Sequence, residues 1–221
     1  MPTVVGLKRK KRTREWYFVY LSDGREILSY IDFIVKFKVK IGKQLTEEQI
    51  KEMESESEVI LAKEIAYKFL SYKPRTQKEV TDRLRAKGFQ SDLVSRVVEE
   101  LKNYGFINDF EYARNFVLSK SRSKTLGALA LKRELLSRGL SNEIIDEVLS
   151  ERENLIDEFE IALNLAQGKL KQIKSLKKRK KGRDEYKRRI YEFLLRRGFK
   201  FETINRVMRE IFDDFENLTS D

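Results

Sequence analysis

The chain has 221 residues, of which 40% are hydrophobic and 38% are charged, and its formal net charge is +11. This length can bury a sizeable core, and two prolines with so many charges favour a mostly helical protein. The lack of cysteine excludes disulfides, thiolate zinc sites and a cysteine nucleophile, and the lack of histidine removes the commonest general base and metal ligand. We expect no cofactor, no metal and no enzymatic activity.

Two further absences in the sequence bear on location. No apolar run approaches the roughly 20 residues that a bilayer-spanning helix needs, and no secretory signal begins the chain. We therefore expect a cytoplasmic protein that does not enter a membrane. The helical segments show no heptad seam, so we expect a monomer.

The positive charge is concentrated in two segments. Residues 1–43 carry 11 basic and 4 acidic side chains, and residues 177–189 carry 9 basic and 2 acidic ones, so each segment has a net charge of +7. The rest of the chain therefore sums to −3. Two basic clusters on a nearly neutral body indicate a polyanionic partner, nucleic acid first among them. A solvated surface that keeps the protein soluble is the alternative.

The first 43 residues differ from the remainder. Residues 14–21 are rich in aromatic and β-branched residues, a turn signal follows, and residues 25–30 return as a second strand. Residues 3–9 supply a third strand, and a short helix follows at about 31–38. The sequence Thr46-Glu47-Glu48-Gln49 is a capping box that begins the next helix.

The rest of the chain contains an internal repeat. Residues 76–101 read as two helices interrupted at Lys87-Gly88-Phe89, and the pattern returns at Arg138-Gly139-Leu140 and at Arg197-Gly198-Phe199. With a preceding helix, each copy becomes a three-helix unit that is too small to bury its apolar face alone. We predict a mainly α fold: three tandem three-helix repeats in an extended curved array, with a small N-terminal module containing a β-hairpin.

The predicted boundaries follow from these patterns. They are a β-containing basic module at 1–43, a linker helix at 44–57, and repeats at 58–105, 106–153 and 154–221, the third with a basic insertion of about eight residues. The second repeat should contain helices near 109–122, 125–138 and 141–153. The last helix of the chain should run from about 201 to 215.

Each helix pair around a glycine turn also resembles a DNA-reading helix-turn-helix. The exposed positions of the would-be reading helices carry acids such as Asp92, Glu99 and Glu100, which phosphates would repel. Only the last helix, with Asn205, Arg206 and Arg209, offers suitable side chains. We therefore disfavour sequence-specific reading of a major groove.

The candidate binding residues are basic side chains around the middle helix of each repeat, which would form a broken basic stripe if the repeats stack in a line. They are Arg75, Lys78, Arg85 and Lys87; Arg122, Lys124, Lys132, Arg133 and Arg138; and Lys177, Lys178, Arg179, Lys180, Lys181, Arg183, Arg188 and Arg189. A second candidate DNA-binding set, equally consistent with a plain hairpin connection, lies near the N-terminus. It consists of Lys8, Arg9, Lys10, Lys11, Arg12 and Arg14.

An ordered series of residues carries a family resemblance. Arg75-Thr76, Glu79-Val80, Leu84, Lys87-Gly88-Phe89 and Gly105-Phe106-Ile107-Asn108-Asp109, followed by a second pass through Arg138-Gly139-Leu140, resemble the bacterial RecX family of regulatory proteins. The resemblance covers residues 60–150 firmly and the rest loosely. Asn108 stands where the family usually has an acid, and the basic insertion near 177–183 lies outside the common pattern.

The resemblance implies a specific function. RecX-like proteins modulate the recombinase RecA: they lie in the groove of the RecA–DNA filament and suppress ATP hydrolysis, strand exchange and coprotease activity. It also implies weak, sequence-nonspecific binding to single- and double-stranded DNA. The alternative is a sequence-nonspecific DNA-binding protein that acts without RecA, in which Trp16, Tyr17, Phe18 and Tyr20 could stack on bases.

Overall fold

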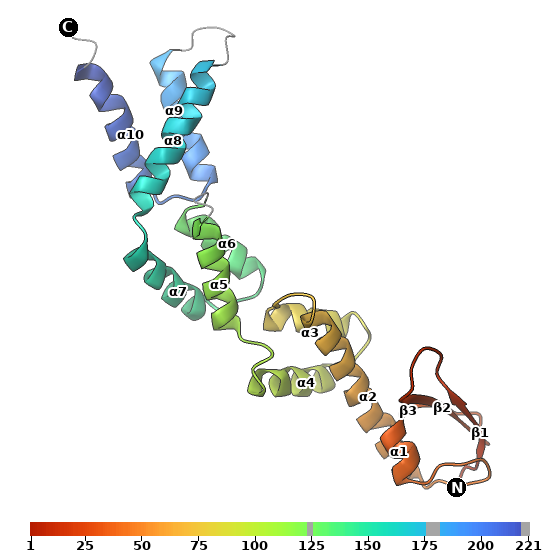
Figure 1. Cartoon of the computed structure of the whole chain (residues 1–221). Coiled ribbons are helices and arrows are strands. Elements are labelled where there is room, and N and C mark those ends of the chain that lie inside the picture. Colours follow the sequence, from red (N-terminus) through yellow and green to blue (C-terminus); the bar gives the residue numbers. More distant parts are fainter. Residues whose placement is uncertain (123–125, 176–181, 218–221) are drawn as a thin grey trace. The chain divides into compact units, whose positions relative to one another are not determined.

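The computed structural model describes residues 1–122, 126–175 and 182–217, and in these residues the chain is mainly helical with one small antiparallel sheet (Figure 1), as predicted. The elements are β1 (Val4–Arg9), β2 (Trp16–Leu21), β3 (Glu26–Tyr30), α1 (Ile31–Lys36), α2 (Glu47–Leu70), α3 (Gln77–Arg85), α4 (Ser91–Asn103), α5 (Asp109–Arg122), α6 (Ala128–Ser137), α7 (Asn142–Leu155), α8 (Glu158–Ser175), α9 (Arg183–Arg196) and α10 (Phe201–Asn217). They form two compact units, one of residues 1–74 and 80–106 and the other of 75–79 and 107–221.

The sheet has the order β1-β2-β3, with the aromatic strand in the middle. Because side chains alternate between the two faces of a strand, Val19 and its register partner Ile27 share one face, and both are buried. They pack with Ile50 and Met53 of α2 in one hydrophobic core. The sheet therefore has an inner face that is covered by helix and an outer face that does not contribute to this core.

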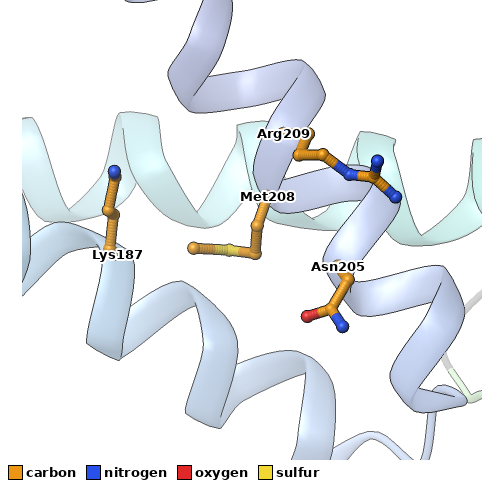
Figure 2. Close-up of a pocket in the computed structure, with 4 residues that line it drawn as sticks. All are labelled: Lys187, Asn205, Met208 and Arg209. Carbon is orange, nitrogen blue, oxygen red and sulfur yellow. The ribbon is translucent and has the colours of Figure 1, made fainter.

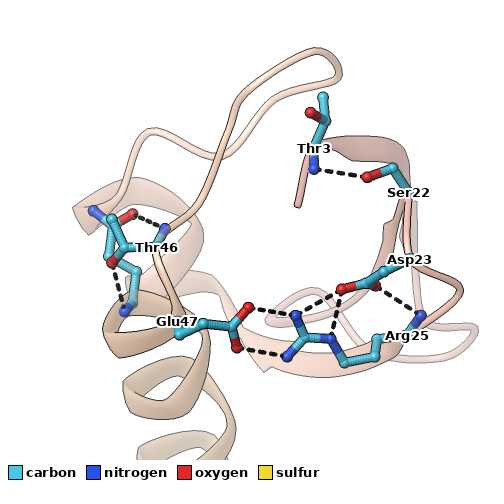
Figure 3. A network of polar contacts seen from close by, with 7 residues as sticks. Thr3, Ser22, Asp23, Arg25, Thr46 and Glu47 are labelled. Carbon is cyan, nitrogen blue, oxygen red and sulfur yellow. Dashed lines mark hydrogen bonds and ion pairs between the residues drawn. The ribbon is translucent and has the colours of Figure 1, made fainter. Parts of the chain in front are cut away.

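A charged network ties the β2–β3 turn to the start of α2 (Figure 3). Nη2 of Arg25 lies 2.7 Å from Oδ2 of Asp23 and 2.7 Å from Oε1 of Glu47. The hydrogen bonds from Arg25 hold the pKa of both carboxyl groups below their ordinary values. Beside this network, Thr46 and Gln49 form the predicted capping box, in which each backbone N–H donates to the other side chain.

The α2 helix is longer than the patterns suggested. The predicted linker helix and the first helix of the first repeat form one continuous helix of 24 residues. Its N-terminal half covers the sheet, and its C-terminal half, with buried Val59, Ala62 and Ala66, belongs to the first repeat. One rigid helix therefore joins the β module to that repeat, and the ion pair of Lys63 with Glu100 of α4 (2.5 Å) adds to its packing.

The second unit contains two helical cores. One lies among α5, α6 and α7 around Leu131, Leu135 and Ile145, and the other lies among α8, α9 and α10 around Ile190 and Phe199. Helices α5, α6, α7 and α10 follow the predicted ranges within a few residues. The five predicted domain boundaries themselves remain a prediction.

The glycine of each turn takes a left-handed conformation, and two of these turns form matching junctions. Gly139 and Gly198 have φ of 81° and 77°, which favours glycine. The Thr76 hydroxyl donates to the carbonyl of Arg138 (2.8 Å), and the N–H of Gly127 donates to the carbonyl of Arg197 (2.9 Å). Thr76 and Gly127 occupy equivalent repeat positions, 51 residues apart, so the start of one middle helix meets the glycine turn of the following repeat in both cases.

A buried arginine strengthens the second junction. Arg152 of α7 is 3% exposed, and its guanidinium donates to Oε1 of Glu158 (2.9 Å) and to Oγ of Ser121 (3.0 Å). The same Glu158 oxygen accepts from the N–H of Ala128 at the start of α6 (2.7 Å). A desolvated ion pair of this kind contributes mainly by satisfying groups that cannot reach water, so loss of either partner is costly.

The junction generates a stability prediction. A Cβ at Gly127 would lie 2.4 Å from the carbonyl oxygen of Gly198, and its three nearest neighbours are all backbone atoms. We expect Gly127→Ala to lower the free energy of unfolding by about 1–3 kcal/mol, as overpacking does. Gly168→Ala in α8 is the matched control, because nothing lies within 4 Å of its added Cβ. In urea titrations the control should be neutral or stabilising by about 0.5–1 kcal/mol; equal loss in both variants would contradict the close approach.

The Arg25 network generates a pH prediction. Because Asp23 and Glu47 have lowered pKa values in the fold, their stabilising contribution is present above their ordinary values of 3.8 and 4.5 and is lost as the pH falls through the lower folded values. We expect Arg25→Gln to lower the thermal midpoint at neutral pH and to reduce its fall upon acidification below about pH 4.5. Lys51→Gln, at an exposed position of α2, should leave the acid profile unchanged.

Candidate binding surface of the helical repeats

The basic residues around α3 differ in their surroundings. Arg75 is half-buried and lies 3.6 Å from Glu79 in an ion pair. The carbons of Lys78 lie against Gly139, where an added Cβ would come within 2.9 Å of three of them. Lys78 is nevertheless exposed overall, as are Arg85 and Lys87, for which no such contact with a neighbouring repeat is seen among the described residues. Of the four predicted residues, the two near the start of α3 therefore contact neighbouring protein, and the two near its end face solvent.

The residues around α6 divide in the same way. Lys132 pairs with Asp146 of α7 (2.6 Å). The guanidinium of Arg138 lies 4.5 Å from the ring centre of Phe116, a cation–π arrangement. Arg133 is exposed. Arg122 ends α5, and its side chain, like all of Lys124, lies outside the part of the chain that the structure describes.

The third basic group is only partly described. Lys177, Lys178, Arg179, Lys180 and Lys181 lie in residues 176–181, outside the described ranges. In α9, Arg189 pairs with Glu185 (3.0 Å), whereas Arg188 is exposed. Arg183 donates to the carbonyl of Phe212 and so ties α9 to α10.

The predicted set therefore separates into structural and solvent-facing cations. Arg85, Lys87, Arg133 and Arg188 are exposed and lie on or next to the middle helices. Lys78 and Arg183 are exposed too, but Lys78 lies against Gly139 and Arg183 donates to the carbonyl of Phe212. They do not occupy equivalent positions: the residues equivalent to Arg85 are Leu136, 51 residues later, and Leu195, a further 59 residues on, and they are 41% and 50% exposed. The repeats share a framework but present different chemistry outward.

A pocket in the third repeat gathers cations from two helices. Its volume is about 390 Å³, and it is lined by Lys187 of α9 and by Asn205, Met208 and Arg209 of α10 (Figure 2). Figure 2 shows the Met208 thioether directed toward Lys187. Asn205 and Arg209 were two of the three possible DNA readers. The third, Arg206, stacks on the ring of Phe159 at 3.8 Å and has a structural role.

A second pocket, between repeats two and three, has internally balanced charges. Its volume is about 250 Å³, and its lining includes the Lys132–Asp146 pair and the Lys200–Glu153 pair. Hydrogen bonding to Glu153 raises the pKa of Lys200 above its ordinary value. Since each cation already has a carboxylate partner, this pocket is a poorer anion site than the α9–α10 pocket.

Sequence reasoning missed Met208 and Arg152 as residues of special interest. Met208 occupies a repeat position that reads as core, and nothing in the sequence distinguishes a pocket wall from core at that place. Arg152 did leave a signal. It is equivalent to Leu101 and Ile211, which are both buried, so an arginine at this repeat position indicates a buried polar partner.

No helix in the described residues is long and apolar enough to cross a membrane. Across the same ranges, no group of three or more acidic side chains is placed to hold a metal ion. The tandem three-helix units define the class of this chain, a helical-repeat protein.

Comparisons with known proteins agree with this class and specify it. Models of the first, second and third three-helix domains of RecX match residues 62–101, 108–149 and 156–208. The regulatory protein RecX of Clostridium botulinum is 31% identical over 95% of this chain and 96% of its own length, and that of Bacillus licheniformis is 31% identical over 98% and 80%. The chain belongs to the RecX family of regulatory proteins.

Solved structures support the fold. A crystal structure of regulatory protein RecX superposes with a TM-score of 0.70 at 19% identity and covers 97% of this chain and 100% of its own. RecX from Lactobacillus salivarius gives a TM-score of 0.61 at 27% identity over 69% of this chain and 96% of its own. The family resemblance inferred from the repeat motifs is confirmed by the three domain models and by the relatives at 31% identity.

Substitution of a cation that contacts protein should affect stability more than substitution of a solvent-facing one. Arg138→Ala removes a side chain that stacks on Phe116, so we expect a loss of about 1 kcal/mol in the free energy of unfolding. Arg133→Ala, at an exposed position of α6, should stay within about 0.5 kcal/mol of the parent protein. Urea titrations followed by circular dichroism test both. Equal losses would mean that the contact with Phe116 contributes nothing measurable.

Proposed function

We propose that this protein regulates the recombinase RecA by binding in the groove of the RecA–DNA filament, where it suppresses ATP hydrolysis, strand exchange and coprotease activity. The observation that carries the proposal is the triple repeat of the RecX family combined with outward-facing cations on or beside α3, α6 and α9.

Physical reasoning supports a filament as the partner. A chain of tandem repeats offers several weak contacts on one frame, and their combined affinity rises through effective concentration. A polymer presents the same surface at regular intervals, so several contacts can form together. Free recombinase subunits or short DNA offer fewer simultaneous contacts.

The test is a titration of single-strand-dependent ATP hydrolysis by RecA with this protein, with naked-DNA binding measured in parallel by anisotropy. We expect inhibition at amounts well below one molecule per recombinase subunit. Inhibition that appears only at amounts that coat the DNA would support the alternative, a sequence-nonspecific DNA-binding protein that acts without RecA.

The solvent-facing cations should carry part of this inhibition. We expect the combined variant Arg85→Ala, Lys87→Ala, Arg133→Ala and Arg188→Ala to raise the half-inhibitory concentration about tenfold, because charge pairs at an interface steer and hold the partner. The matched control removes the same charge from exposed lysines elsewhere, namely Lys40, Lys51, Lys68 and Lys171. Equal weakening by both variants would mean that only net charge matters.

The basic insertion allows a separate test of the proposal. Replacing Lys177 to Lys181 with alanine should weaken filament or DNA binding and leave helix content unchanged by circular dichroism. A coincident loss of helix content would give this segment a structural role instead.

A further inference from the structure

The outer face of the N-terminal sheet carries two adjacent cross-strand rows with an aromatic side chain in each. Register pairs Phe18 with Lys8 on β1 and with Leu28 on β3. Two residues further along β2, Tyr20 pairs with Gly6 and Glu26. Because the pleat alternates, both aromatic side chains project from the face opposite the helix-covered core.

These aromatic side chains are not part of the core. Phe18 and Tyr20 are half-buried and do not belong to the cluster of Val19, Ile27 and their helical partners. Trp16, two residues before Phe18, lies on the same face but is buried, and its Nε1 donates to Glu64 of α2 (3.0 Å). Helix therefore covers that end of the outer face, and the part that remains is formed by Phe18 and Tyr20.

The glycine on β1 shapes the surface under Tyr20. A Cβ at Gly6 would lie 3.1 Å from Cδ2 and 3.6 Å from Cγ of Tyr20. The Tyr20 ring therefore lies across the backbone of β1 instead of standing away from the sheet. A ring in this position can present a flat π-face on a rigid support.

Charge is distributed across this face from one edge to the other. Residues 8–14 hold six basic side chains and no acidic one, and they cover the end of β1 and its connection to β2. Lys8 and Lys11 are exposed, and Nζ of Lys10 lies 5.9 Å from the Trp16 ring centre. The opposite edge, β3, carries the exposed carboxylate of Glu26.

We propose that this outer face is a binding platform for single-stranded nucleic acid, with Phe18 and Tyr20 stacking on bases and the β1 edge contacting the phosphates. Stacking on aromatic side chains beside a cationic track is the usual chemistry of such sites. A duplex keeps its base faces stacked inside, so it can use only the cations. Repulsion by Glu26 keeps the phosphates at the β1 edge, so the bases point toward β3. This proposal does not depend on the action on RecA.

The test uses the full chain, without recombinase, and a fluorescein-labelled oligothymidylate of about 20 nucleotides, long enough to span one such platform. We expect Phe18→Leu with Tyr20→Leu to weaken binding about tenfold, in line with the loss of two stacked bases. Phe18→Tyr with Tyr20→Phe keeps both rings and should bind as the parent does. Tyr72→Leu, at a 73% exposed position outside the sheet, is the matched aromatic control.

Two further measurements locate the site. Trp16 is the single tryptophan of the chain, so oligothymidylate should change its emission if phosphates draw Lys10 away from the ring. Affinity for a duplex of equal length should be unchanged in the leucine variant, because no base face is available to stack.

The proposal is overturned if the leucine variant binds oligothymidylate as tightly as the parent, or if it loses single strand and duplex equally. It is also overturned if polyglutamate and polyphosphate, compared at equal concentrations of negative charge, displace the oligonucleotide equally well. The face would then recognise charge alone. Folding of the leucine variant is checked by its near-ultraviolet circular dichroism spectrum. If that spectrum changes, the test relies on the variant Phe18→Tyr with Tyr20→Phe, which keeps both rings.

Discussion

The architecture of the second unit depends on one recurring contact, in which the start of a middle helix meets the glycine turn of the next repeat. The backbone of Gly127 approaches that of Gly198 so closely that a single added carbon would collide with it. The first N–H groups and the last carbonyl groups of a helix lack intrahelical partners. In this contact, the N–H of Gly127 donates to the carbonyl of Arg197 at the end of α9. The buried ion pair of Arg152 with Glu158 lies beside this contact, and Glu158 also accepts from the N–H of Ala128.

This arrangement explains why so many cations of the predicted set have structural roles. Near each junction, side chains are close enough to protein to find partners: Lys78 lies along Gly139, and Arg138 stacks on Phe116. Away from the junctions, Arg133 and Arg188 remain exposed. Packing geometry therefore divides the basic residues, and the exposed ones are the rational targets for studies of binding.

The sequence predicted most helices, the Thr46 capping box and the three-stranded module because those features depend on local patterns. The Thr46 capping box and the glycine turns depend on neighbours within a few residues. The continuity of α2 was not predicted, although no helix-breaking residue separates its two halves. The two halves pack against different parts of the protein, and the spacing of apolar residues in a helix does not indicate which part each half contacts. The pocket formed by α9 and α10 escaped it because residues from different helices meet there only after folding.

By itself, the sequence determined the repeat, the family and the uneven charge, since each depends on which residues follow one another. Only the tertiary structure decided which cations face solvent, that Arg152 is buried, and that Phe18 and Tyr20 share the outer face of the sheet and stay partly exposed. The physical reason is that exposure and pairing depend on contacts between segments distant in sequence, whereas helices, turns and caps are fixed by hydrogen bonds within a few residues.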